Sequence, residues 1–125
     1  MENLTNKNLV LKFYDEVFNG WDTSRLDHYM REDYKQHNAQ VEDGREGFRR
    51  FCEKFLALKP HMDIQHILAD GDLVCVFFKC TLGVNGMVNK VFDMYRVQDG
   101  KLAEHWDCVE HNLGSVTPVH PNGLF

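Results

Sequence analysis

The stretch that most constrains this chain is Val91–Glu110, which reads VFDMYRVQDGKLAEHWDCVE. Two runs of alternating apolar and polar residues flank a turn at Gln98-Asp99-Gly100, and this pattern predicts a β-hairpin. Successive side chains of a strand point to opposite faces, so one face of the hairpin has to be covered by the rest of the chain. The other elements are therefore expected to pack against this hairpin.

The hairpin carries two pairs of polar residues at strand spacing. Asp93 and Tyr95 are two residues apart in the first run, and His105 and Asp107 are two residues apart in the second. The side chains of each pair project from one face of their strand. Whether the two pairs share a face depends on the register.

The register follows from the turn. A plain two-residue turn would place Asp93 opposite Trp106 and mix polar with apolar residues on both faces. A type I turn followed by a left-handed Gly100, the G1-bulge arrangement, instead places Asp93 opposite His105. We therefore predict the bulged register, which puts Val91, Asp93, Tyr95, Ala103, His105 and Asp107 on one face and Phe92, Met94, Leu102, Trp106 and Cys108 on the other.

A cluster of acids and imidazole on a half-buried sheet face is costly unless it is well paired or faces a wet cavity. A pocket is the interpretation we prefer. The alternative is an ordinary strand whose polar side meets solvent, as many antiparallel sheets show.

Composition excludes several classes of function. The chain has 125 residues, of which 43% are hydrophobic and 26% charged, and this favours one ordinary globular domain over residues 1–125. A formal net charge of -5 argues against a nucleic-acid partner. No apolar run reaches membrane-spanning length and the start, MENLTNKN, lacks a signal-peptide pattern, so we expect no membrane contact and a cytoplasmic location.

The cysteines form no CxxC pair and lie in apolar segments, so they are predicted to be reduced core residues rather than a disulfide frame or a zinc site. No neighbouring feature suggests an activated thiolate. They are Cys52, Cys75, Cys80 and Cys108.

The first half of the chain has helical periodicity and predicts three helices. Asn6–Asn19 follows a Thr5 cap, and Ser24–Met30 follows Asp22 and Thr23. The third helix opens with capping-box spacing between Asp43 and Glu46 and ends before Pro60; its residues Phe48, Phe51 and Phe55 form an apolar wall that is core or lines a cavity.

Two polar side chains before the strands are candidates for the pocket. His37 closes a short extended piece, Asp33–Asn38, just before a loop, where it could reach a pocket mouth or simply meet solvent. Tyr14 could point its hydroxyl into a cavity from the first helix, or be core.

The second half of the chain changes to strand periodicity. A strand from His61 and the nearly all-apolar Leu73–Leu82, expected to be covered on both faces, precede Met87–Val97 and the hairpin, giving a four-strand meander. The tail, residues 114–125, has no periodicity and reads as an extended arm lying on the body or on a partner. Helices first and an antiparallel sheet afterwards predict an α+β fold, with three helices over one curved sheet enclosing a cone.

Several motifs resemble a known family. The segments YKQHNAQVEDGREGFRRF and FDMYRVQDGKLAEHWD, with the closing Asn122–Phe125, are similar to SnoaL-like polyketide cyclases of the NTF2-like (cystatin-like α+β) superfamily. The resemblance covers nearly the whole chain, and Gln36-His37-Asn38 and Glu104–Asp107 carry most of it.

The resemblance implies a conical half-barrel with a deep pocket, a homodimer through the outer sheet face, and cofactor-free aldol-type ring closure with a pocket Asp as general acid/base. The residue that matches this Asp is Asp107, while Asp93, His105 and His37 match polar pocket positions less closely. The superfamily also uses this cone for isomerases, dehydratases and non-catalytic binding proteins, so the fold does not decide the function.

The predicted chemistry is proton abstraction next to a carbonyl. A carboxylate in an apolar cavity is a stronger base than one in water, because desolvation disfavours its charge. The expected ligand is small and apolar or aromatic, with no metal and no cofactor. Two alternatives remain: a metal site using His105, Asp107, His111 and His37, and a non-catalytic binding dimer. The predicted site comprises Asp107, His105, Asp93 and His37 as catalytic residues and Tyr14, Tyr95, Phe51 and Phe55 as substrate-binding residues.

Overall fold

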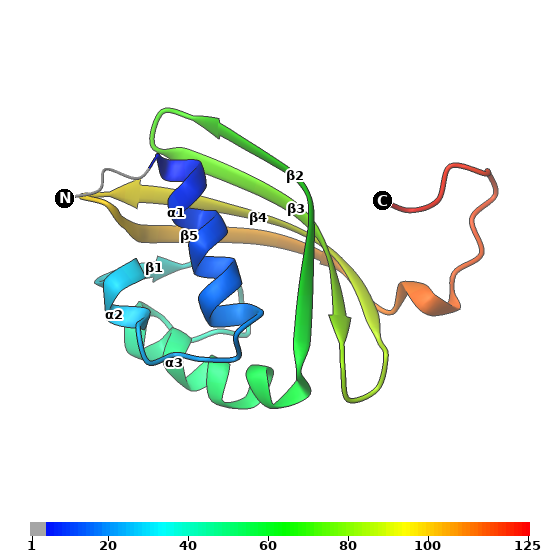
Figure 1. The fold of residues 1–125 in the computed structure, drawn as a ribbon, viewed down its shortest axis with the longest axis horizontal. Helices are drawn as coiled ribbons and strands as arrows, with labels where there is room; N and C mark the ends of the chain where they lie inside the picture. The colour runs from blue at the N-terminus through cyan, green and yellow to red at the C-terminus, as the bar shows by residue number, and fades with distance from the viewer. Residues whose placement is uncertain (1–4) are drawn as a thin grey trace.

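A computed structural model describes residues 5–125 of the chain; residues 1–4, which the single-domain prediction includes, lie outside the described part. Five strands form one sheet in the order β1-β5-β4-β3-β2, in which only β1 and β5 run parallel. The long strands curve around the helices, which lie on the inner side of the sheet (Figure 1). The predicted α+β fold with a curved, mainly antiparallel sheet is confirmed.

The elements follow one another in the predicted order of helices and then strands. They are α1 (Asn6–Phe13), the π-helical η1 (Tyr14–Phe18), α2 (Leu26–Tyr29), β1 (Met30–Gln36), α3 (Gly44–Phe55), the 3-10 helix η2 (Leu56–Leu58), β2 (Pro60–Asp70), β3 (Leu73–Leu82), β4 (Val88–Gln98), β5 (Lys101–Glu110) and the 3-10 helix η3 (Leu113–Ser115).

The helices differ from the prediction in their ends. Thr5 caps α1 as expected, because its side chain accepts a hydrogen bond from the Asn8 backbone N–H. The predicted first helix is α-helical only to Phe13 and continues as the π-helical turn η1. The predicted second helix is a single turn, because Met30 already belongs to β1.

The predicted capping box of α3 does not form. Asp43 holds the N-cap position, but its side chain makes no capping bond. Its carboxylate accepts instead from the backbone N–H of Gln36 at 2.8 Å, since β1 ends directly beside it. This contact ties the start of α3 to the end of β1, where the polar network described below begins.

The hairpin register differs from the predicted one. Asp99 and Gly100 both have positive φ, 54° and 75°, which is the geometry of a type I′ turn. The bulge lies further on, at Ala103, so that Asp93 is opposite Asp107 rather than His105. Leu102 pairs with Val97, is fully buried and belongs to the inner face, against the prediction.

The sheet has one covered and one open face. Residues of β3 alternate strictly between buried and half-buried, so β3 is covered on its inner face only, and the prediction of cover on both faces is wrong for the single chain. Cys108 is exposed rather than in the core, and all four cysteines are free. Within residues 5–125, no helix combines the length and apolar character needed to cross a membrane.

The C-terminal residues extend past the end of the sheet and turn back (Figure 1). The Phe125 ring lies 6.1 Å from the Phe77 ring on β3, with the Lys79 and Lys90 ammonium groups 5.6 and 5.7 Å from its centroid. Val119, between the body and this contact, is fully exposed. The arm thus reaches the outer face of the sheet through one aromatic side chain.

Candidate active site

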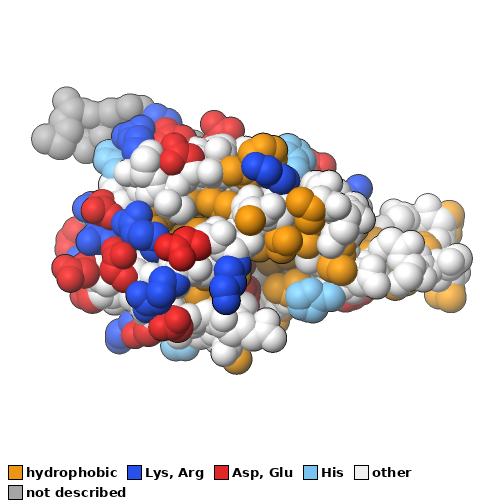
Figure 2. Space-filling view, turned by 90° about the horizontal axis from the view of Figure 1, so that it is seen from below, with side chains coloured by type: hydrophobic (Ala, Val, Ile, Leu, Met, Phe, Trp, Pro, Cys, Tyr) orange, Lys and Arg blue, Asp and Glu red, His pale blue; other side chains and the backbone are white. Residues whose placement is uncertain are grey.

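A cavity of about 310 Å³ opens between α3 and the inner face of the sheet. Its acidic residues and His105 lie at the floor, on β4 and β5, and no lysine or arginine of residues 5–125 lines it. Around the outside, charged side chains gather at one end of the molecule, and apolar side chains show between them and the C-terminal arm (Figure 2). The apolar wall includes Phe18, Phe48, Phe51, Phe55, Phe78 and Met87.

A buried network surrounds Asp93 at the floor. Tyr14 donates a short hydrogen bond to Asp93 Oδ2, and the Tyr95 hydroxyl donates to the same oxygen at 3.2 Å. The two hydroxyls are 2.9 Å apart. The other carboxylate oxygen, Oδ1, lies 3.0 Å from His105 Nε2. The π-helical turn of η1 places Tyr14 over β4, and π-turns of this kind recur at functional sites.

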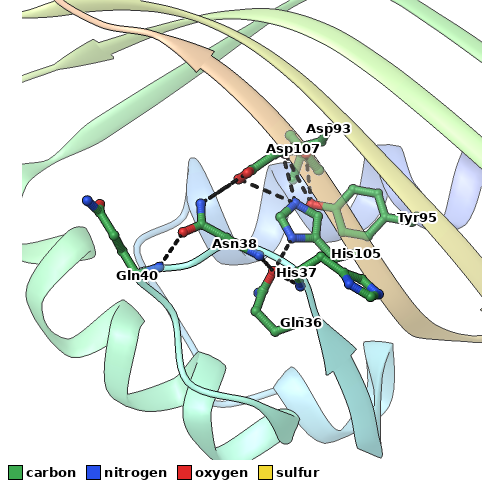
Figure 3. A network of polar contacts seen from close by, with 9 residues as sticks. Gln36, His37, Asn38, Gln40, Asp93, Tyr95, His105 and Asp107 are labelled. Carbon is green, nitrogen blue, oxygen red and sulfur yellow. Dashed lines mark hydrogen bonds and ion pairs between the residues drawn. The ribbon is translucent and has the colours of Figure 1, made fainter.

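The hydrogen bonds place a proton on one ring nitrogen of His105. Gln36 Oε1 accepts from the backbone N–H groups of His37 and Asn38, both at 3.0 Å, so this atom is the amide oxygen. It also lies 2.7 Å from His105 Nδ1, which must therefore donate (Figure 3). His105 therefore carries a proton on Nδ1, and its Nε2 shares a hydrogen bond with Asp93 Oδ1.

The buried tyrosines remain hydrogen-bond donors. The pKa values of Tyr14 and Tyr95 are raised well above the usual range, mainly by burial and next by the negative charge of Asp93. Burial and the charges of Asp93 and Asp107 likewise raise the pKa of Tyr34. The Tyr34 ring stacks on the His105 ring at 6.3 Å, but its hydroxyl has no partner among the described residues.

Asp107 is the second acid of the floor and has a different environment. Asn38 Nδ2 donates to both of its carboxylate oxygens, at 3.0 and 2.9 Å. His105 Nε2 is 3.8 Å from Asp107 Oδ2. Asn38 is itself held because its Oδ1 accepts from the backbone N–H of Gln40. Asp107 thus lines the cavity with an oriented carboxylate beside the His105 ring.

The comparisons with known proteins show the family and the fold of the chain. Residues 8–112 match the family described as SnoaL-like polyketide cyclase. The chain belongs to the SnoaL-like polyketide cyclase family. No curated protein matches the sequence.

Solved structures similar to this SnoaL-like chain share its fold. TsrD from Streptomyces laurentii has 19% identity and a TM-score of 0.72, over 88% of this chain and 92% of that one. IdmH from Streptomyces antibioticus, a candidate polyketide cyclase, has 22% identity and a TM-score of 0.72, over 86% and 93%. A candidate polyketide cyclase from Acidithiobacillus ferrooxidans has 19% identity and a TM-score of 0.74, over 88% and 92%.

Most of the predicted site residues of this SnoaL-like protein meet in one place. Asp93, His105 and Asp107 form the floor, and Tyr95 lines the cavity beside them. The two predicted phenylalanines, Phe51 and Phe55, stack on each other at 5.0 Å in the cavity wall. Tyr14 is fully buried behind the floor and bonds to Asp93 rather than lining the cavity.

His37 does not join this group. Its Nε2 lies 2.7 Å from Glu104 Oε2, and its ring stacks on Trp106 at 5.0 Å on the outer side of the sheet. The pKa of Glu104 is lowered by His37 first and by Arg96 next. Figure 3 shows the His37 ring pointing away from Asp107.

Four amides that line this cavity are absent from the predicted set. Gln36 and Asn38 flank His37, and the signal that could have found them was strand alternation through the Gln36-His37-Asn38 motif. Gln40 follows in the loop after β1. Asn89 lines the cavity further along β4 and is 9% exposed, and a single Asn inside a predicted strand gives no sequence signal of this kind.

The floor also contains a possible metal-binding group. Ligand atoms of Asp93, His105 and Asp107 lie within 4.8 Å of one another. Two carboxylates and one imidazole are suitable ligands for several divalent ions. Of the other histidines in the metal alternative, His111 lines the cavity but is outside this group, and His37 is on the other face.

Proposed function

We propose that this cavity is the active site of an enzyme that performs cofactor-free acid/base chemistry on an apolar carbonyl compound. The reaction class is aldol-type cyclisation, isomerisation or dehydration. The observation that carries the proposal is the Asp107 carboxylate, which Asn38 orients with two hydrogen bonds at the floor of a cavity with an apolar wall. Family membership supports the reaction class.

The proposed reaction begins with Asp107. Its carboxylate takes a proton from the carbon next to the substrate carbonyl, and the electron pair moves to the carbonyl oxygen to form an enolate. The free amide N–H of Gln36 is the donor available to that oxygen, because Tyr14 and both ring nitrogens of His105 are already bonded to other residues. Asp93 acts behind this donor by holding His105 in place.

The following step returns the proton. In a cyclisation the enolate carbon attacks a second carbonyl, and the new alkoxide takes the proton from Asp107, which regenerates the base. In an isomerisation the proton returns to a different carbon, and in a dehydration it leaves with a hydroxide as water. Each variant uses the same residues, and each is balanced without a metal or a redox cofactor.

The test is solvent-deuterium exchange into the methyl group of 4-acetylbiphenyl, a neutral aryl ketone of suitable width, followed by proton NMR. We expect saturable exchange above the buffer rate. Protein treated with a chelator should exchange at the same rate; exchange lost on chelation and restored by one divalent ion would favour the metal alternative instead. Tight binding of the ketone without any exchange would favour the non-catalytic binding protein.

We also propose that the protein is a homodimer through the outer sheet face. Phe77 and Phe92 stack on this face at 4.5 Å, Phe92 is 48% exposed, and Leu68 on β2 is 68% exposed. A contiguous apolar area of this kind marks an interaction site, and a second copy would also cover the half-buried residues of β3.

Replacing Phe92 by glutamate should separate the dimer. The carboxylate would be buried without a partner at the centre of the proposed interface, which costs several kcal/mol. Light scattering on a sizing column should give twice the 14.6 kDa chain mass for the wild type and the single-chain mass for Phe92→Glu. A wild-type protein that runs as a single chain at micromolar concentration would contradict the proposal.

A further inference from the structure

Asn89 stands out among the residues that line the cavity, because the catalytic proposal does not use it. It is 9% exposed, and its Oδ1 accepts from the backbone N–H of Asn112 at 3.0 Å. A backbone N–H can only donate, so the contact fixes which end of the amide is oxygen. The Asn89 Nδ2 group is then a donor with no partner among the described residues.

Within residues 5–125, the buried side-chain polar atoms without a hydrogen-bond partner are Tyr34 Oη and Arg45 Nε. The Asn89 Nδ2 group is therefore not sealed in the core but open to the cavity, where water or a ligand can accept its hydrogen bonds. Asn89 lies on the inner face of β4, four residues before Asp93. Four strand residues span about 13 Å, so the free amide lies well away from the reacting floor. His111, just past the end of β5, lines the same end of the cavity.

The floor has a matching donor. Gln36 Oε1 is occupied by three N–H groups, two from the backbone and one from His105, and its Nε2 has no partner among residues 5–125. The cavity therefore offers one free amide N–H group at its floor, next to His105, and another at its far end, and phenylalanine side chains are among the residues that line it. No lysine or arginine of the described chain lines this space.

We infer that Asn89 determines specificity by donating a hydrogen bond to a second acceptor oxygen of the substrate. The length of strand between Asn89 and the reacting floor, about 13 Å, sets the separation of this oxygen from the reacting carbon. This inference rests on the proposed function. The substrate class is then an elongated, neutral and largely aromatic molecule with a carbonyl or hydroxyl oxygen at each end. The acidic floor disfavours an anion there, and the volume of about 310 Å³ suits a slender two-ring molecule better than a wide fused polycycle.

The test compares two probes of the same shape. 4,4′-Diacetylbiphenyl carries an acceptor oxygen at both ends, and 4-acetyl-4′-isopropylbiphenyl replaces the far carbonyl oxygen by a methyl group. The quantity measured by calorimetry is the preference, the ratio of the two dissociation constants. Comparing preferences between variants cancels the difference in hydrophobicity and the statistical advantage of the symmetric diketone.

Asn89→Asp is the main variant, because it keeps the acceptor for the Asn112 backbone and removes the donor. Asn89→Leu is the second, and Thr81→Val, on the open face of β3, is the control. We expect the preference for the diketone to fall about three- to tenfold in both Asn89 variants, the usual worth of one hydrogen bond, and to stay at the wild-type value in Thr81→Val.

An unchanged preference in both Asn89 variants would overturn the inference, as would a wild-type protein that binds neither probe. The two proposals can fail separately. An unchanged preference together with exchange of 4-acetylbiphenyl that needs Asp107 would overturn the role of Asn89 alone. A preference that depends on Asn89, without any exchange, would overturn the catalytic proposal and leave the recognition of a neutral two-ended ligand.

Discussion

Replacing Asp93 by leucine is expected to lower the free energy of unfolding by about 3–5 kcal/mol, because it leaves two buried hydroxyls and the buried His105 ring without their common partner. Asp93 is 5% exposed, accepts from Tyr14 and Tyr95, and shares a hydrogen bond with His105. A total stability of about 5–15 kcal/mol is typical of a domain, so the loss would be a large part of it. Urea unfolding followed by circular dichroism measures it.

Asp93→Asn is the matched control for this prediction. The amide keeps an acceptor for the tyrosine hydroxyls and offers an N–H to His105 Nε2, while the ring keeps its proton on Nδ1. We expect a loss of about 1 kcal/mol, the value of an ordinary hydrogen bond. Equal losses for the two variants would mean that packing, and not the network, explains the effect.

The buried tyrosines predict a steep loss of stability in alkali. A phenol whose pKa is raised in the folded state stabilises the fold below its unfolded pKa of about 10, and that contribution is lost as the pH rises further. Tyr14, Tyr34 and Tyr95 all have raised pKa values, and the pKa of Tyr29 is raised to about 12. These four groups lower the free energy of unfolding by about 5 kcal/mol per pH unit between pH ~10 and the Tyr29 pKa of about 12.

The measurement is tyrosinate absorbance and circular dichroism along one pH series. These four residues are all the tyrosines of the chain, so we expect almost no tyrosinate until the secondary structure is lost cooperatively. Tyr34→Phe, which removes a hydroxyl without a partner, should reduce the slope by about one quarter. Tyrosinate that appears near pH ~10 while the circular dichroism is still native would contradict the account.

The polar face of the hairpin could be predicted because a register shift by an even number of residues leaves every side chain on the same face. Asp93 was predicted opposite His105 and lies opposite Asp107, a shift of two residues. The four polar residues Asp93, Tyr95, His105 and Asp107 therefore share a face in both registers. The position of the bulge could not be read from the sequence. Asp-Gly suits a type I′ turn as well as a G1 bulge, and nothing marks Ala103 as the extra residue.

The other differences come from contacts between distant parts of the chain. His37 was predicted in the site and lies outside it, because β1 alternates and its neighbours Gln36 and Asn38 take the inner face. The position of Tyr14 depends on a π-helical turn, which is rare and has no reliable sequence signature. Asn89 becomes informative only when the contact with Asn112 shows which of its amide atoms is free.

The rate of deuterium exchange into 4-acetylbiphenyl by Asp107→Asn tests the central claim most directly. Asparagine keeps the shape of the side chain but cannot accept the proton, so we predict exchange about 10²- to 10⁴-fold slower than in the wild type, with ketone affinity within about threefold. Asp63→Asn, on an exposed residue of β2, is the control and should exchange at the wild-type rate. Exchange by Asp107→Asn at the wild-type rate would contradict the assignment of Asp107 as the base.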